Sequence, residues 1–205
     1  MSEPTGAFSE TTVDPDPMKQ FAVWFKDAQA AGEILPEAMT LATATQSGAP
    51  SARMVLLRGT DERGFGFFTN YDSQKGRELA DNPQAALVIY WGKLGRQVRI
   101  TGSVVRQSTE ESEAYFHNRP VASQISAAIS PQSQVVESRR DLEQRAAKLA
   151  DRYKNGVVPL PANWGGYRLI PEAIEFWVHR ENRLHDRLRY AKKPGGGWTI
   201  ERLAP

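Results

Sequence analysis

The sequence predicts a mainly β chain with helices, in which an antiparallel sheet closes into a barrel. Three observations support this fold class. Short apolar runs of strand length are joined by tight turns, as at Gln46-Ser47-Gly48 and Gly195-Gly196-Gly197. Residues 97–101 alternate between polar and apolar side chains, which is typical of a strand with one buried face. A sheet of seven or more strands must hide its edges, and closure into a barrel does so most completely.

The expected elements follow from the same patterns. The first is a helix that Asp16 can cap, that Pro17 can open and that Gly32 can end. Further helices are expected from Ser73 to just before Pro83, from a capping box at 108–111, and over 131–153. Strands are expected at 39–45, 51–58, 65–69, 84–91, 95–107, 167–170, 174–179, 187–190 and 198–203.

The chain of 205 residues is long enough for one domain with a substantial core and short for two. Residues 1–15 are small, polar and acidic, and they are expected to form a flexible N-terminal tail. Residues 16–205 contain no interdomain linker and no internal repeat, so they are expected to form a single domain.

Composition excludes several classes of function. The chain has no cysteine, which excludes disulfides and thiolate chemistry and favours a reducing, cytoplasmic compartment. Its net charge of +2 is too small to suggest a nucleic-acid partner, and no apolar run reaches membrane-spanning length. The histidines His117, His179 and His185 are too dispersed for a typical metal site, so none is expected. No P-loop, dinucleotide fingerprint or nucleophilic serine elbow is present.

Cations and amides gather on or beside the expected strands. Arg53 lies in an otherwise apolar strand that ends at Arg58, and it is either the partner of an anion or a solvated edge residue. Ser73-Gln74-Lys75 opens a helix, where free backbone N–H groups and a lysine can bind phosphate. An ordinary N-cap with a surface lysine explains the same residues equally well.

Two further groups point to small anions. Tyr115, Arg119 and Ser123 are spaced by four residues and suit a phosphate monoester. Pro120 interrupts their helix, and local hydrogen bonds at a helix end are the alternative. In the segment 183–187, two arginines and a histidine alternate, so an extended chain would place them on one side around an anion. A charged turn with a salt bridge to the aspartate of the segment is the alternative.

Together these stretches resemble the pyridoxine (pyridoxamine) 5'-phosphate oxidase family over nearly the whole chain, from about Asp16 to Pro205. Each match alone is weak, but their order and spacing are very specific. The matching stretches lie at 53–58, 68–70, 73–75, 96–98, 115–120, 123–125, 132–133, 164–166, 174–187 and 202–205.

The resemblance implies an antiparallel, FMN-binding split β-barrel of Greek-key type, which forms a homodimer with FMN at the subunit interface. It implies that this flavoprotein oxidises pyridoxine 5'-phosphate or pyridoxamine 5'-phosphate with O2. The products would be pyridoxal 5'-phosphate, H2O2 and, from the amine, ammonia. Arg183 and His185 match catalytic positions by the pyridine ring. The positions that match substrate-binding residues are Arg58, Tyr115, Arg119, Ser123, Arg183 and His185. Those that match FMN-binding residues are Arg53, Met54, Val55, Leu56, Leu57, Arg58, Phe68, Thr69, Gln74, Lys75, Gln97, Gln132, Ser133, Trp177 and Arg187.

The chain departs from the family pattern at four positions. Arg58 replaces a usual lysine, Gln74 a usual arginine and Phe68 a usual tyrosine, and Val178 stands where a polar residue or glycine is usual. Two other functions therefore stay open. One is a phenazine-pathway oxidase, which would be expected to lack the stretch from Tyr115 to Gln124. The other is a non-catalytic binder of flavin or pyridoxal phosphate on the same barrel.

Overall fold

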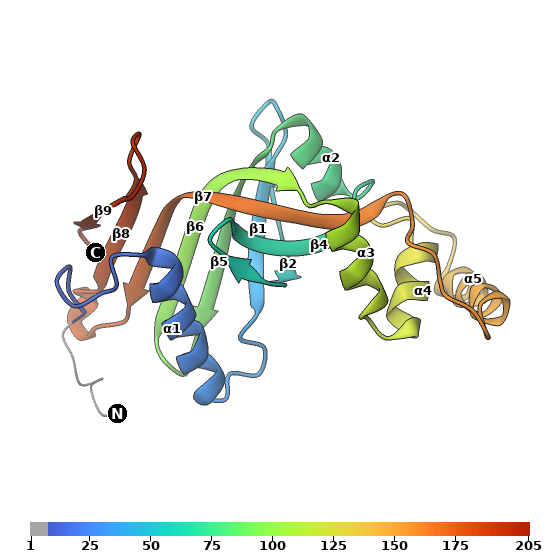
Figure 1. Ribbon diagram of the computed structural model, residues 1–205, viewed down its shortest axis with the longest axis horizontal. Coiled ribbons are helices and arrows are strands. Elements are labelled where there is room, and N and C mark those ends of the chain that lie inside the picture. Colours follow the sequence, from blue (N-terminus) through green and yellow to red (C-terminus); the bar gives the residue numbers. More distant parts are fainter. Residues whose placement is uncertain (1–7) are drawn as a thin grey trace.

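The computed structural model describes residues 8–205, and it confirms the expected α+β class with a single antiparallel sheet. Neighbouring strands follow the order β2-β1-β5-β6-β7-β4-β3, and a further hairpin of β8 and β9 pairs with β7 (Figure 1). The strands are β1 (Ala38–Ala44), β2 (Pro50–Leu56), β3 (Thr60–Asp61), β4 (Gly64–Asn70), β5 (Gln84–Trp91), β6 (Arg96–Arg106), β7 (Trp164–Val178), β8 (Asp186–Lys192) and β9 (Trp198–Arg202). The helices are α1 (Pro17–Ala30), α2 (Gln74–Asp81), α3 (Thr109–His117), α4 (Val121–Ile129), α5 (Arg139–Arg152) and a short 3-10 turn, Glu181–Arg183.

The sheet closes into a barrel where the end of β2 meets β4. The backbone N–H of Arg58 donates to the carbonyl of Gly66 at 2.7 Å, and the N–H of Gly66 donates to the carbonyl of Gly59 at 2.9 Å. These bonds satisfy backbone groups that would otherwise stay unpaired at the two edges of the sheet. Closure of the sheet therefore confirms the expected barrel.

Strand β7 links the barrel to the C-terminal hairpin. Its first part pairs with β4, its last part pairs with β8, and β6 runs beside it along almost its whole length. The expectation of two separate strands at 167–170 and 174–179 was wrong, because the strand continues through Pro171, which pairs with Gly102, and a bulge at Glu172 takes up the shift in register. Opposite the bulge, a Cβ on Gly102 would lie 2.0 Å from the carbonyl oxygen of Ile170, so only glycine fits there.

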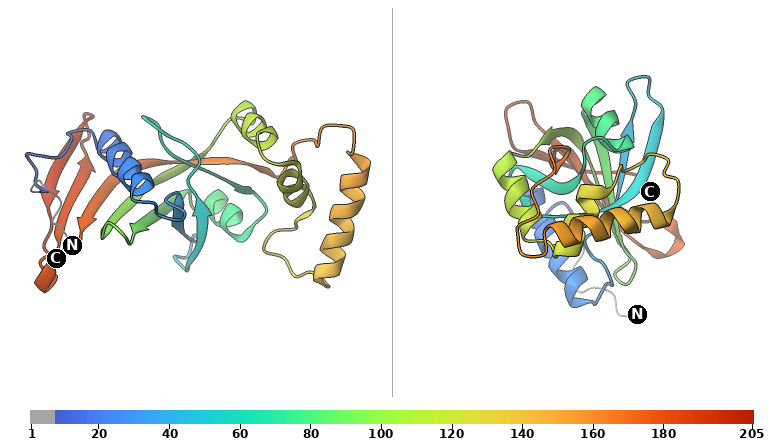
Figure 2. Two further views of the ribbon diagram at one scale, coloured as in Figure 1. Left: turned by 90° about the horizontal axis from the view of Figure 1, so that it is seen from below. Right: turned by 90° about the vertical axis from the view of Figure 1, so that its right-hand side faces the viewer.

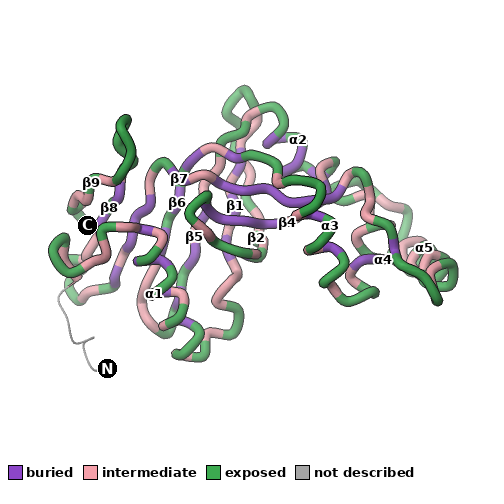
Figure 3. Tube along the Cα trace, viewed as in Figure 1, coloured by how far each residue is buried: buried purple, intermediate pink, exposed green. Residues whose placement is uncertain are grey.

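Helix α1 packs its apolar face against the barrel core. Asp16 caps it by accepting the N–H of Met18 at 2.9 Å. Phe21 meets Phe65 edge-on at 4.9 Å, and Trp24 meets Phe176 edge-on at 5.0 Å. Each such fully buried aromatic side chain contributes about 2–3 kcal/mol. Figure 3 shows that the buried residues concentrate in the strands beneath α1.

Helices α3, α4 and α5 gather at the end of the molecule opposite the β8–β9 hairpin (Figure 2). The expected capping box is present, because Ser108 accepts the N–H of Glu111 and Glu111 accepts the N–H of Ser108, both at 3.1 Å. The helix expected over 131–153 begins only at Arg139. Residues 131–138 form a turn at 132–133 followed by irregular chain, and Ser133 has a φ of 69°.

The chain before α1 packs against α1 itself and against the C-terminal strands. The Phe8 ring packs in a tilted orientation against Trp24, with ring centroids 5.2 Å apart. Glu10 forms an ion pair with Arg202 at 2.8 Å. Residues 1–7 of the expected flexible tail lie outside the described residues. Within residues 8–205, no helix is both long and apolar enough to cross a membrane, and no group of three acidic or histidine side chains could hold a metal ion.

Candidate active site

A cavity of about 610 Å³ lies between the end of β2, strand β4 and helices α3 and α4. Its volume suits a ligand of cofactor size. Eleven of the residues expected at the site line it, and they come from segments far apart in the sequence. They are Met54, Val55, Leu56, Arg58, Phe68, Thr69, Lys75, Tyr115, Arg119, Ser123 and Gln132.

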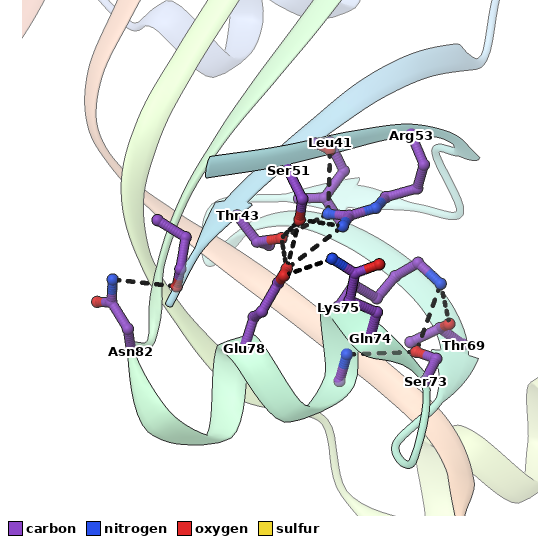
Figure 4. A network of polar contacts seen from close by, with 12 residues as sticks. Leu41, Thr43, Ser51, Arg53, Thr69, Ser73, Gln74, Lys75, Glu78 and Asn82 are labelled. Atoms are coloured by element: carbon purple, nitrogen blue, oxygen red, sulfur yellow. Dashed lines mark hydrogen bonds and ion pairs between the residues drawn. The ribbon is translucent and has the colours of Figure 1, made fainter. Parts of the chain in front are cut away.

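One part of the cavity is built around the buried ammonium of Lys75. Ser73 caps α2 and places Lys75 in the first turn, where backbone N–H groups are free. The Nζ atom lies 3.2 Å from the Thr69 hydroxyl and 3.4 Å from that of Ser73 (Figure 4). It also lies 3.3 Å from Oε1 of Gln132. Burial, together with the positive charge of Arg53, lowers the pKa of Lys75 to about 8. A bound anion would compensate this ammonium.

Arg53 lies behind Lys75, and its charge is matched by Glu78 of α2. The guanidinium is 3.3 Å from Oε2 of Glu78, which also accepts from the hydroxyls of Ser51 and Thr43 (Figure 4). Burial alone would raise the pKa of Glu78, but these hydrogen bonds, one from Gln74 at 2.9 Å and the charge of Arg53 lower it to about 2. Arg53 and Gln74 therefore support α2 from outside the cavity lining.

A second cationic group surrounds Arg119. Tyr115 lies on α3 and Ser123 on α4, and Pro120 separates the two helices, yet all three expected residues line the same cavity. The Nη1 atom of Arg119 is buried without a hydrogen-bond partner. Burial lowers the pKa of Arg119, and the nearby positive charge of Arg58 contributes to the shift. Arg58 itself is 3.8 Å from Glu37, a loose pair. A half-buried cation without a close counter-charge favours an incoming anion.

The remaining expected residues lie elsewhere. Leu57 is buried in the barrel core and Ser133 follows Gln132 in a turn outside the cavity lining. A third group lies on β6, β7 and β8 and on the turn between β7 and β8, and none of its residues lines the cavity. It comprises Gln97, Trp177, Arg183, His185 and Arg187.

This third group is held together by strand pairing. Trp177 of β7 is opposite both Gln97 and Arg187, and its ring lies 4.6 Å from that of His185. Arg187 donates to Glu175 at 2.8 Å. The expectation of an extended segment with three groups on one side was wrong, because Arg183 ends a 3-10 turn with a φ of 61°. The aspartate of the segment pairs with Arg180 and Arg202, both at 2.7 Å.

Comparisons with known proteins agree with this geometry. Residues 25–153 match the family model for pyridoxamine 5'-phosphate oxidase, and residues 164–205 match the model for the pyridoxine 5'-phosphate oxidase C-terminal dimerisation region. Relatives named pyridoxine/pyridoxamine 5'-phosphate oxidase are 56% identical in Paraburkholderia phymatum, over 98% of this chain and 94% of the relative, and 56% identical in Rubrobacter xylanophilus, over 96% and 90%. The chain belongs to the pyridoxine/pyridoxamine 5'-phosphate oxidase family.

Two solved structures share the fold of this chain. PhzG from Burkholderia lata, solved with tetrahydrophenazine-1-carboxylic acid, superposes with a TM-score of 0.92 at 33% identity, with 98% of each chain covered. A pyridoxamine 5'-phosphate oxidase-related, FMN binding protein from Nostoc punctiforme superposes with a TM-score of 0.73 at 16% identity, over 93% of this chain and 98% of the other. The second match supports the fold alone.

Several cavity residues of this oxidase-family chain were missed by sequence reasoning. Trp164 lines the cavity beside Arg119, and Asn70, Pro120, Ser126, Ala127 and Ser130 complete the lining. Trp164 stood in a stretch that resembles the family, but no role was assigned to it. Glu78, which neutralises Arg53, was also missed, because nothing in its helical spacing distinguishes it from a surface glutamate.

Proposed function

We propose that this chain is an FMN-dependent oxidase that converts pyridoxine 5'-phosphate or pyridoxamine 5'-phosphate to pyridoxal 5'-phosphate, with O2 as the electron acceptor. One observation carries the proposal: a single cavity contains two separate cationic groups, around Lys75 and around Arg119. Two phosphorylated molecules bound side by side would compensate them. We assign the activity to the cytoplasm, since a chain without cysteine needs no oxidising compartment.

The residues around Lys75 fit the phosphate of FMN. A buried ammonium, a capped helix N-terminus and the Thr69 hydroxyl offer charge and hydrogen bonds to one dianion. Met54, Val55 and Leu56 would lie along the rest of the cofactor, since this edge of β2 lines the cavity. When bound, FMN supplies the redox chemistry, accepting a hydride equivalent from the substrate and returning the electrons to O2 as H2O2.

The residues around Arg119 would bind the phosphate ester of the substrate. The guanidinium offers a charged fork, and the hydroxyls of Tyr115 and Ser123 add donors. Arg58 contributes a second positive charge close by. Held at its phosphate, the substrate presents its oxidisable carbon at a fixed depth in the cavity, so positioning supplies much of the rate. With the cofactor carrying the redox step, the chain needs no strong general base.

We further propose that the third group completes the cavity of a partner chain in a homodimer. None of its five residues, Gln97, Trp177, Arg183, His185 and Arg187, lines the cavity of its own chain, and the β8–β9 hairpin lies at the end of the molecule opposite α3, α4 and α5 (Figure 2). Residues 164–205, which carry four of the five, match a dimerisation region. Contacts in a two-fold dimer are reciprocal, so if the third group of one chain reaches the cavity of its partner, the partner's group reaches the cavity of the first chain. Arg183 and His185 would then act on the substrate ring.

An assay of oxygen uptake and pyridoxal 5'-phosphate formation with both esters tests the oxidase. We expect product from at least one ester in air. Arg119→Ala should raise KM about 100-fold, equivalent to about 2.7 kcal/mol, because a charge-assisted contact to the phosphate is lost. Arg140→Ala, at an exposed arginine of α5, is the matched control and should change nothing. An FMN-loaded protein that forms no aldehyde from either ester would refute the proposal.

Mixed dimers test the shared cavity. Co-expression of Arg119→Ala with His185→Ala, each on a differently tagged chain, gives a dimer in which one cavity carries both substitutions and the other carries neither. This mixed dimer should keep about half of the wild-type activity, although each parent is nearly inactive. A mixed dimer no better than its parents would show that both residues serve the cavity of their own chain.

The likeness to PhzG favours one second candidate, an oxidase of the phenazine-pathway type. The two candidate functions differ in their need for the residues around Arg119. A vitamin B6 ester needs them to bind its phosphate, whereas a carboxylated tricyclic substrate has no phosphate to bind. Full activity of Arg119→Ala on a B6 ester would favour the second reading.

A further inference from the structure

Arg119 is held in place by aromatic rings instead of acidic groups. Its Cζ atom lies 4.9 Å from the centre of the Trp164 ring and 6.0 Å from that of Phe116. Within residues 8–205, no carboxylate is close enough to Arg119 to form an ion pair. The buried Nη1 atom also lacks a hydrogen-bond partner. The guanidinium therefore takes its position from Trp164, and its N–H edges stay available.

Trp164 is itself rigidly placed. It opens β7, opposite Asn70 of β4, and only 7% of it is exposed. Its ring is nearly parallel to those of Phe68, 5.6 Å away at 16°, and Tyr115, 6.2 Å away at 3°. The Phe116 ring meets it edge-on, 5.2 Å away at 65°. Packing against three rings restricts the Trp164 side chain to one orientation. The ring face that Trp164 presents to Arg119 is therefore fixed.

We propose that Trp164 is a positioning residue for the binding of a phosphate monoester, because it holds the Arg119 guanidinium over its ring. This inference rests on the proposed function, and it assigns to Trp164 a role that the phosphate contacts alone do not. A carboxylate partner would orient Arg119 equally well but would compete with the phosphate for its N–H groups. An aromatic face orients the cation through its quadrupole and leaves every donor free.

The same arrangement explains how a half-buried arginine remains charged without a carboxylate. Burial penalises the cation and Arg58 repels it, whereas the Trp164 face offsets part of both effects. Phosphate then meets a cation that is already desolvated and ordered, so little side-chain entropy is lost on binding.

A double-mutant cycle on the FMN-loaded protein tests the proposal, with the dissociation constant of pyridoxal 5'-phosphate measured by equilibrium dialysis. Trp164→Leu should weaken binding about tenfold, equivalent to about 1.4 kcal/mol. Trp164→Phe keeps an aromatic face and should lose less than about threefold. In an Arg119→Ala background, Trp164→Leu should add no further loss, because the cation that it orients is gone.

The alternative is a purely structural role for Trp164. In that case Trp164→Leu would weaken binding equally with and without Arg119, and that additivity would overturn the proposal. If the leucine variant does not fold, the same cycle with Trp164→Phe decides, since its smaller loss must also vanish in the Arg119→Ala background. Wild-type binding of pyridoxal 5'-phosphate together with unchanged binding by Trp164→Leu overturns this inference alone. Wild-type protein that binds no B6 ester overturns the proposed function as well.

Discussion

Lys75 should make the affinity for FMN depend on pH. Its pKa of about 8 in the ligand-free protein means that the ammonium is about nine-tenths charged at pH 7 and about one-tenth charged at pH 9. A bound phosphate favours the charged form and raises that pKa, so binding takes up one proton above pH 8. The phosphate itself is already a dianion over this range, because its second pKa is about 6. The dissociation constant should therefore rise about tenfold from pH 7 to pH 9, equivalent to about 1.4 kcal/mol.

Quenching of flavin fluorescence on titration of apoprotein measures this dependence. Lys75→Met should bind FMN more weakly at pH 7 and should lose the slope between pH 7 and 9. Lys75→Arg should bind with little slope, because the guanidinium stays protonated throughout. A flat wild-type curve, or the same slope in Lys75→Met, would refute the assignment of Lys75 to the cofactor phosphate.

Two further predictions concern stability. Glu78→Gln should lower the free energy of unfolding by about 2 kcal/mol at pH 7, because Arg53 loses its counter-charge. The folded-state pKa of about 2 lies below the usual 4.5, so the contribution is present above pH 4.5 and is lost as the pH falls toward 2. Urea unfolding at pH 7 and pH 3 measures both effects, and an equal difference at the two pH values would contradict them. Gly102→Ala should cost about 3 kcal/mol in the same assay, because its Cβ meets the Ile170 carbonyl, whereas Gly195→Ala, with open space, should cost less than about 0.5 kcal/mol. Equal stability of these two glycine variants would argue against the tight bulge.

Local sequence signals predicted most of the elements. Asp16 and Ser108 are caps whose partners lie within three residues, so their helices could be placed from neighbouring residues alone. The strand alternation of 97–101 depends only on which face is buried. Strand β7 was misjudged at Pro171, since a proline normally ends a central strand and only the partner strand reveals the bulge.

The candidate site was harder to predict, because it depends on contacts between distant segments. Tyr115, Arg119 and Ser123 were identified as a group, although they come from α3, the link that follows it and α4. The pairing of Arg53 with Glu78 joins residues 25 positions apart, and no spacing rule connects them. The alternation at 183–187 predicted an extended segment, but Asn182 and Arg183 adopt positive φ values that residue type alone does not require.

The central claim is that one cavity binds two phosphates, one at Lys75 and one at Arg119. A crystal structure of the protein with FMN and pyridoxal 5'-phosphate tests it most directly. We predict phosphate oxygens within about 4 Å of the Lys75 ammonium for FMN and of the Arg119 guanidinium for pyridoxal 5'-phosphate, both in the same cavity. Either phosphate bound away from its cation, with that cation facing only solvent, would contradict the account.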